Sequence, residues 1–267
     1  MLVGKYRFST GISNSELFHS LTEGENAATI STTLAEGLTA RQQAHILTRT
    51  LGIDSTRFMN LIQDRKFMQS FGIESPSLEG FLFPETYGFR WQVEEKEIVS
   101  KLVKKFQSFY TDSLQVRAKA LGLTTNQVVT LASIVEGEAR LAVERSTISG
   151  VYHNRLRKGM KLEADPTVRY TLENEPRRIY YNDLRIDNPY NTYKNPGLPP
   201  GPINNPGGSS ILAALFPATH TYLFFVADGL GGHKFSSTYA EHLRYVGKYK
   251  RERKIQERLS AIKSKTR

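Results

Sequence analysis

The sequence contains no cysteine, which excludes disulfide bonds, thiolate metal sites and cysteine nucleophiles. No apolar run approaches the roughly 20 residues that a membrane-spanning helix needs, and no secretory leader opens the chain. What remains is a chain of 267 residues, of which 39% are hydrophobic. That content is sufficient for a sizeable core in one large domain or two to three small ones.

Several catalytic signatures are also missing. There is no G-x-S-x-G nucleophile motif, no glycine-rich phosphate loop, and no pair of histidines at metal-ligand spacing. We therefore expect neither a metal nor a cofactor. We interpret His233, in the segment 231–235, as a loop histidine with a structural hydrogen bond rather than as a base.

The net charge of +10 is concentrated at the C-terminal end of the chain. Residues 244–267 contain ten Lys or Arg against two Glu, a local balance of +8, so the remainder is near +2. We interpret this segment as a solvated helix, with contact to anionic lipid or an anionic polymer as the alternative. Because the basic residues are not interleaved with aromatic ones, nucleic-acid binding is disfavoured.

The segment 127–145 is predicted to be helical and carries two glutamates in an otherwise apolar run. Thr124 and Gln127 have capping-box spacing, so the helix should begin near Thr125. Apolar residues at steps of three and four define one helix face, which comprises Val128, Leu131, Ala132, Val135, Ala139 and Ala142.

Glu138 lies at the edge of that apolar face, where partial loss of water should raise the pKa of its carboxyl toward the range of a proton donor. Glu136 is turned by about 200° around the helix and should face elsewhere. The alternative is that both are solvated charges, with Glu136 paired to Arg140 four residues later.

The rest of the chain mixes helices with short strands. Capping boxes at Ser13 with Glu16 and at Thr39 with Gln42 predict two helix starts, and Gly52 is a plausible stop for the second helix. We further predict strands at 6–8 and 29–34, helices at 56–63 and 97–110, and a buried strand-turn at 78–87 that belongs to the core rather than to a substrate site.

The segment 195–208 is rich in proline and glycine and is predicted to be an ordered loop. Flat aromatic rings and planar amides, which bind polysaccharides, gather around it in Tyr190, Asn191, Tyr193, Asn204 and Asn205. The alternative is that these side chains satisfy the backbone of the loop itself. Asp165, which precedes Pro166, is a helix N-cap or faces the same site.

Six segments occur in a characteristic order: LEGFLFPETY (78–87), SIVEGEAR (133–140), NRLRKGMKLEADPTV (154–168), YNTYKNPGLPPGPI (190–203), NPG (205–207) and YLFFVADGLGGHKF (222–235). Together they closely resemble the YceG-like family of endolytic murein transglycosylases, over nearly the whole chain. In that family the catalytic carboxylate is the second glutamate of S-[IV]-[IV]-E-x-E, which here is Glu138. The chain departs from the commoner pattern at Gly137, Ala139 and Glu163, without loss of a group that the chemistry requires.

The resemblance implies a lytic transglycosylase that cleaves the β-1,4 bond between N-acetylmuramic acid and N-acetylglucosamine inside peptidoglycan strands. The products would carry 1,6-anhydro-muramic ends, and nascent strands would be terminated. It implies Glu138 as the catalytic acid and Glu136 as a possible second acidic residue. It implies a substrate-binding set of Asp165, Tyr190, Asn191, Thr192, Tyr193 and Asn205.

The expected partners are peptidoglycan glycan strands and cell-wall synthases or division proteins. The expected location is the inner membrane, with the catalytic region on the periplasmic side and a single-pass anchor that lies outside this chain. Two alternatives stay open: a non-catalytic cell-wall-binding scaffold, and a hydrolase that uses water. A typical hydrolase needs two carboxylates about 5–9.5 Å apart, whereas a lytic transglycosylase needs only one acid.

The expected fold is α+β. A partial LysM-like module, without its first strand, is expected at 1–35, followed by a mixed middle segment at 36–115. The catalytic region, with its acid on a helix, is expected at 116–247, and a basic C-terminal helix or tail at 248–267.

Overall fold

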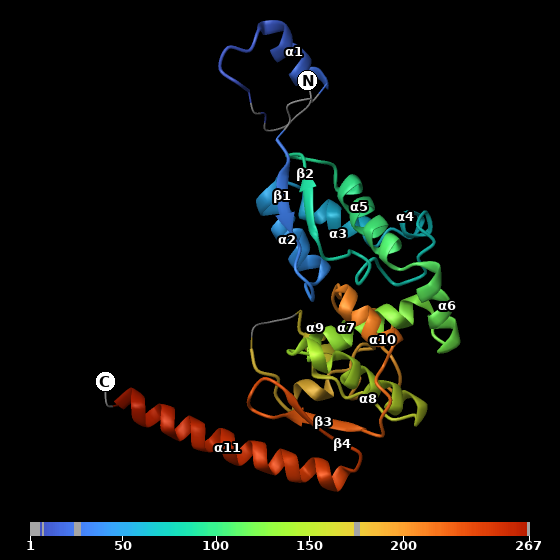
Figure 1. The fold of residues 1–267 in the computed structure, drawn as a ribbon, viewed down its shortest axis with the longest axis vertical. Helices are drawn as coiled ribbons and strands as arrows, with labels where there is room; N and C mark the ends of the chain where they lie inside the picture. Colours follow the sequence, from blue (N-terminus) through green and yellow to red (C-terminus); the bar gives the residue numbers. More distant parts are fainter. Residues whose placement is uncertain (1–5, 7, 24–27, 174–176, 266–267) are drawn as a thin grey trace.

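The computed structural model describes residues 6, 8–23, 28–173 and 177–265, and it combines many helices with two short antiparallel strand pairs (Figure 1). The mixture confirms the α+β prediction. The helices are α1 (Asn14–Glu23), α2 (Ala40–Leu51), α3 (Ser55–Leu61), α4 (Arg65–Gln69), α5 (Glu95–Phe109), α6 (Asp112–Ala120), α7 (Thr125–Glu138), α8 (Arg145–Arg157), α9 (Asp165–Thr171), α10 (Gly208–Leu215) and α11 (Tyr239–Lys265). The strands are β1 (Ile30–Thr33), β2 (Thr86–Phe89), β3 (Phe224–Ala227) and β4 (His233–Ser236), and two 3-10 turns lie at Ala142–Glu144 and Asp183–Arg185.

One part of the molecule is built from β1, β2 and the helices α2 to α5 (Figure 1). Helix α2 begins with the predicted capping box, in which Thr39 and Gln42 bond reciprocally, and it ends at Gly52 in the left-handed conformation with φ of 73°. The predicted helices at 56–63 and 97–110 correspond to α3 and α5, each of which begins one or two residues earlier.

The predicted strand at 29–34 is present as β1, and it pairs with β2 in antiparallel register, Ile30 opposite Phe89. This pairing joins the expected 1–35 module to the middle segment, since β2 lies beyond the boundary drawn at residue 35. The predicted strand at 6–8 includes Arg7, which lies outside the described residues. The capping box of Ser13 with Glu16 is present at the start of α1. A LysM-like module remains a prediction.

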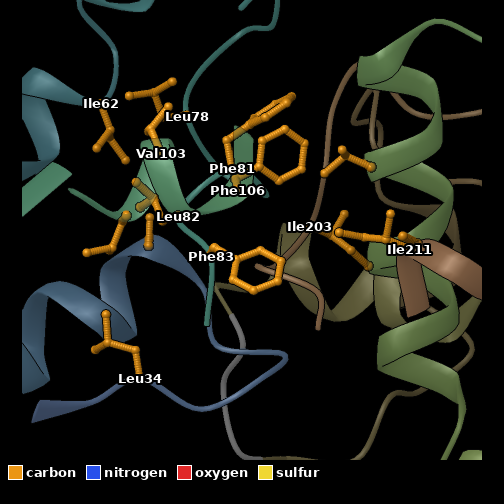
Figure 2. Packing of buried hydrophobic residues seen from close by; sticks show 14 of the residues in the cluster. Leu34, Ile62, Leu78, Phe81, Leu82, Phe83, Val103, Phe106, Ile203 and Ile211 are labelled. Carbon is orange, nitrogen blue, oxygen red and sulfur yellow. The ribbon is translucent and has the colours of Figure 1, made fainter. Parts of the chain in front are cut away.

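The segment 78–87 lies in the core, as predicted, although only its last two residues belong to a strand. Phe81 and Phe106 pack edge to face with ring centroids 5.1 Å apart, and Figure 2 shows Phe83 directed toward Ile203 of the later loop. Gly80 has φ of 87°, and a Cβ atom there would lie 2.4 Å from Pro202. The glycine therefore allows the two chain segments to pack in direct contact, within one hydrophobic cluster.

Helix α7 is central to the second part and packs against α8, α9 and α10. It begins with the predicted capping box at Thr124, but the predicted helix to residue 145 is wrong, because α7 ends at Glu138 and Ala139 is extended. A continuous helix would separate residues 136 and 145 by about 13.5 Å along its axis. The chain instead turns back, so that Arg145 pairs with Glu136 at 3.1 Å and Ala142 is exposed in a 3-10 turn.

The basic C-terminal segment is helical, as expected, and begins within α11. Figure 1 shows α11 extending away from the body of the protein, and its first turns contact β3 and β4. His242 stacks on Phe224 of β3 with ring centroids 5.3 Å apart. In the part of the chain that the structure describes, we find no helix with the length and apolar character needed to cross a bilayer.

Candidate active site

Glu138 occupies the last position of α7 and faces a cavity of about 300 Å³. The walls come from α7, α8, the start of α9, the loop after α9, and the β3–β4 hairpin. The lining residues are Glu138, Tyr152, Arg155, Leu162, Glu163, Asp165, Tyr193, Phe225, Val226, Ala227 and His233. Segments separated by almost one hundred residues in the sequence thus meet around one carboxyl group.

The carboxyl of Glu138 is held in an environment that favours its neutral form. Burial raises its pKa from the ordinary 4.5 to about 7, and the nearby negative charge of Asp165 adds to the rise. Three contacts act in the opposite direction: the hydroxyl of Tyr152, which donates to Oε1 at 3.0 Å, the charge of Arg155, and the backbone amide of Asp165. Burial dominates, so the carboxyl holds a proton in part of the molecules near neutral pH.

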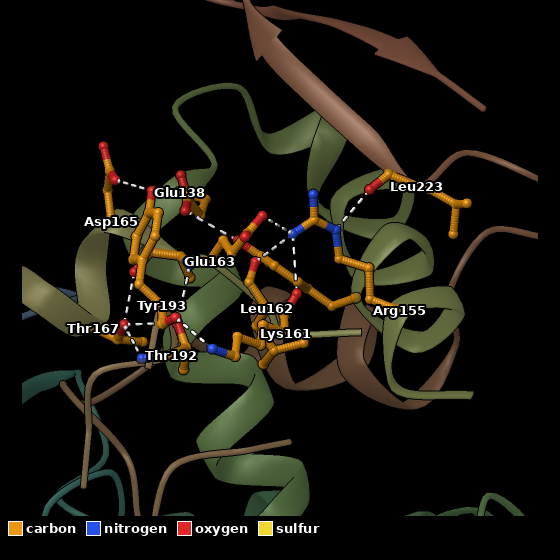
Figure 3. A network of polar contacts seen from close by, with 12 residues as sticks. Glu138, Arg155, Lys161, Leu162, Glu163, Asp165, Thr167, Thr192, Tyr193 and Leu223 are labelled. Atoms are coloured by element: carbon orange, nitrogen blue, oxygen red, sulfur yellow. Dashed lines mark hydrogen bonds and ion pairs between the residues drawn. The ribbon is translucent and has the colours of Figure 1, made fainter. Parts of the chain in front are cut away.

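Asp165 and Tyr193 form a second polar pair in the same cavity. The hydroxyl of Tyr193 donates to Oδ1 of Asp165 at 2.6 Å, which Figure 3 shows beside Glu138. Burial and the charge of Asp165 both raise the pKa of Tyr193, so its phenol stays protonated and acts as a donor. Asp165 is the first residue of α9, after Ala164 at the N-cap, rather than the N-cap itself.

Arg155 forms a rigid wall of the cavity. Its guanidinium donates to the carbonyls of Leu223 at 2.6 Å and Leu162 at 2.8 Å, and to Glu163 Oε2 at 3.3 Å (Figure 3). The sequence prediction did not include Tyr152 or Arg155. The sequence did contain a signal for them. Tyr152 and Arg155 follow Ile148 by four and seven residues, the spacing of one helix face, and all three side chains are buried.

Asn191 and Thr192 lie next to the cavity but are buried inside the protein. Asn191 donates from Nδ2 to the carbonyls of Leu184 and Ile186, and its Oδ1 accepts from the backbone N–H of Tyr193. The hydroxyl of Thr192 accepts from the backbone N–H of Ala164 at 3.0 Å. These contacts fix the loop that carries Tyr193 and the chain that leads into α9.

Asn205 and Tyr190 lie away from this cavity. Asn205 is fully buried, and its Oδ1 accepts from the backbone amides of Gly80 and Leu82. Its Nδ2 donates to Glu79 Oε1 at 2.9 Å, and burial raises the pKa of Glu79 to about 8. Tyr190 lines a different cavity, which Glu79 also lines.

Glu136 also lies outside the cavity, as the helix geometry predicts. Its Oε1 accepts from Arg145 at 3.1 Å, and its Oε2 accepts from the backbone N–H of Gly207 at 3.1 Å. The alternative, a pairing of Glu136 with Arg140, is wrong, because the chain reversal after Glu138 brings Arg145 to this position. The hydrogen bond from Gly207 fixes the proline- and glycine-rich loop against α7.

The cavity thus presents a carboxyl that is partly neutral, a carboxylate, and two tyrosine hydroxyls on fixed elements. Such a set can protonate a leaving oxygen and bind hydroxyl and amide groups around it. Within residues 6, 8–23, 28–173 and 177–265, no group of three or more His, Asp or Glu side chains could hold a metal ion.

The chain resembles known proteins over most of its length. The model of the YceG-like family matches residues 1–248. A Bacillus subtilis protein named endolytic murein transglycosylase is 34% identical over 92% of this chain and 72% of its own length. A Streptococcus pneumoniae D39 protein of the same name is 26% identical, and there the match spans half of the relative's length. A crystal structure of a putative yceG-like protein from Listeria monocytogenes has a TM-score of 0.75 and 33% identity, with 90% of this chain and 83% of that chain covered.

Proposed function

The chain belongs to the YceG-like family, and from that membership we propose that it is an endolytic murein transglycosylase with Glu138 as its general acid. The substrate is the glycan strand of peptidoglycan. The enzyme acts as a lyase that cleaves glycosidic bonds inside the strand. The observation that carries the proposal is the raised pKa of Glu138, about 7, at the wall of an open cavity.

The reaction begins when the protonated carboxyl of Glu138 donates its proton to the oxygen of the β-1,4 bond between N-acetylmuramic acid and N-acetylglucosamine. The bond from C1 to that oxygen breaks, and the carbonyl oxygen of the 2-acetamido group supports the positive charge on C1. The 6-hydroxyl of the N-acetylmuramic acid then attacks C1 of that sugar and gives its own proton to the carboxylate of Glu138. The product is a 1,6-anhydro ring, water is not consumed, and the acid is regenerated.

Asp165 and Tyr193 are the other predicted site residues that line the cavity, and we propose that both contact the glycan. Their mutual hydrogen bond of 2.6 Å presents one polar surface to the substrate. Asn191 and Thr192 act on the substrate only through the loop that they fix. We assign Asn205 and Glu136 to the internal framework, since their polar atoms bond within the protein, and Tyr190 to the neighbouring cavity.

Peptidoglycan lies outside the cytoplasm, and the enzyme acts there. We propose that a membrane anchor outside this chain holds the catalytic region at the periplasmic face of the inner membrane. Termination of nascent strands would place it beside cell-wall synthases or division proteins. The LysM-like character of residues 1–35 belongs to the same proposal.

One observation favours a second candidate, a hydrolase that uses water. Asp165 lines the same cavity as Glu138 and raises its pKa by charge, so two carboxyl groups are available for the two-carboxylate mechanism of glycosidases. Digestion of purified peptidoglycan in ¹⁸O-labelled water separates the two candidates by mass spectrometry. Anhydro-muramic ends without ¹⁸O are expected. Reducing ends that carry ¹⁸O would identify a hydrolase, and glycan binding without cleavage would identify a scaffold protein.

A further inference from the structure

A histidine and a glutamate form a buried pair on the hairpin side of the cavity. Nδ1 of His233 lies 2.8 Å from Oε2 of Glu144, and the backbone N–H of His233 donates to Oε1 of the same carboxylate at 2.9 Å. The two side chains are only 11% and 15% exposed. The sequence prediction of a structural hydrogen bond for His233 is thus met, but the residue lines the cavity of Glu138, which the sequence did not indicate.

The pairing fixes the chemical character of the imidazole. Because the carboxylate of Glu144 can only accept hydrogen bonds, Nδ1 carries a ring proton, and Nε2 is the nitrogen left for other contacts. Among the residues that the structure describes, Nε2 makes no hydrogen bond or ion pair. A carboxylate that orients an imidazole in this manner is the usual device for presenting the opposite nitrogen to a ligand.

Two aromatic rings connect the imidazole of His233 to the proton donor Glu138. Tyr152, which bonds to Glu138, packs edge to face on Phe225 with ring centroids 5.9 Å apart. Phe225 in turn packs edge to face on His233 at 5.2 Å. The imidazole therefore shares the cavity with Glu138 but contacts it only through these two rings, which suits it to the sugar next to the one that reacts.

Anchoring of the hairpin does not require the imidazole ring. The turn between β3 and β4 is closed by Asp228, whose Oδ1 accepts from the backbone amides of Leu230 and Gly232. The backbone amide of His233 already holds Glu144. Gly232 permits this approach, since a Cβ atom there would lie 2.9 Å from Oε1 of Glu144. Nε2 of this cavity-lining ring is left without a structural task.

We propose that His233, oriented by Glu144, is a glycan-binding residue whose Nε2 forms a hydrogen bond with a sugar hydroxyl beside the bond that Glu138 cleaves. The inference rests on the proposed function and deepens it. It assigns the β3–β4 hairpin as the wall that contacts the strand outside the reacting sugar.

The test uses a soluble oligosaccharide of alternating N-acetylglucosamine and N-acetylmuramic acid, and the Glu138→Gln protein, which binds without cleaving. His233→Asn keeps an amide donor near the position of Nδ1, so it preserves the bond to Glu144 and removes Nε2. His45→Asn, on the exposed side of α2, is the matched control. We expect His233→Asn to raise the Kd for the oligosaccharide by about 3- to 10-fold, the scale of one hydrogen bond. In the otherwise wild-type protein it should raise KM more than it lowers kcat, with an unchanged melting temperature.

A second measurement needs no substitution at His233. In ¹⁵N-labelled Glu138→Gln protein, addition of the oligosaccharide should shift the Nε2 resonance of His233 and leave Nδ1 in place. An unchanged Kd and KM in His233→Asn, or an unmoved Nε2 resonance at saturating oligosaccharide, would overturn the inference. If the wild-type protein cleaves peptidoglycan and His233 has no effect, the inference alone fails. If the oligosaccharide binds through His233 and no cleavage occurs, the proposed function fails alone.

Discussion

Replacement of Glu138 by glutamine tests both the chemistry and the physical environment of the acid. Glutamine keeps the size and hydrogen bonding of the side chain but cannot deliver a proton. At pH 7 a carboxyl with a pKa of about 7 is protonated in half of the molecules, whereas one with a pKa of 4.5 is protonated in roughly 1 of 300. We expect Glu138→Gln to lower kcat by at least ~100-fold, the usual scale for a general acid.

Glu138→Gln should also change the free energy of unfolding, in a direction set by the raised pKa of Glu138. Glu138 binds its proton more tightly in the folded protein than in the unfolded chain, so its carboxyl destabilises the fold progressively as the pH rises from 4.5 through about 7. A rise of this size corresponds to about 3 kcal/mol of unfolding free energy. Glu138→Gln should therefore match the wild type at pH 4.5 and exceed its stability by up to about 3 kcal/mol at pH 8.

The two effects are measured on the same preparations. Cleavage of purified peptidoglycan gives the rate, and chemical denaturation at pH 4.5, 6 and 8 gives the free energy of unfolding. A Glu138→Gln protein that is folded and fully active would refute the assignment of the acid. Equal stability of the two proteins at pH 8 would refute the argument that burial holds the proton.

Three further substitutions separate the roles of neighbouring groups. Glu136→Gln should retain more activity than Glu138→Gln but lose stability, because it weakens the buried contact with Arg145. Activity and chemical denaturation of the two variants are measured side by side, and an inactive but folded Glu136→Gln protein would reverse the assignment. Tyr152→Phe removes a hydrogen bond that lowers the pKa of Glu138, so the pKa of this carboxyl should rise. The alkaline limb of the pH profile of kcat/KM should then move to higher pH. A shift to lower pH would contradict the role of Tyr152 as a donor to Glu138. Asn205→Ala leaves the buried amides of Gly80 and Leu82 without their acceptor, so it should lower the free energy of unfolding by about 3 kcal/mol or more. A stable Asn205→Ala variant with weakened glycan binding would instead restore the prediction that Asn205 binds substrate.

Local signals in the sequence were sufficient wherever a feature depends on neighbours along the chain. The capping boxes at Thr39 and Thr124 fix two helix starts, and Gly52 ends a helix because its left-handed conformation suits a residue without a side chain. The aromatic density of 78–87 was enough to place that segment in the core. The helix starts and the helix end depend on contacts within about four residues, and the burial of 78–87 follows from its composition.

The features that the sequence did not indicate depend on distant partners. Asn205 bonds to residues more than 120 positions earlier in the chain, and no local pattern distinguishes it from an amide that binds sugar. The end of α7 at Glu138 accompanies the pairing of Glu136 with Arg145, nine positions later, which a continuous helix would keep apart. The role of His233 depends on Glu144, 89 positions away, and on the hairpin that brings them together.

The two glutamates of α7 acquire opposite roles from their surroundings rather than from their own chemistry. Glu136 has a cationic partner and a backbone donor, Arg145 and the amide of Gly207, so both of its oxygens bond inside the protein. Glu138 contacts the hydroxyl of Tyr152 and the backbone amide of Asp165, while the nearby Arg155 donates to backbone carbonyls and to Glu163. If α7 continued past Glu138, the next turn would cover the carboxyl and pack where the cavity now lies. The break in the helix therefore leaves one carboxyl paired inside the protein and presents the other, still able to hold a proton, to the cavity.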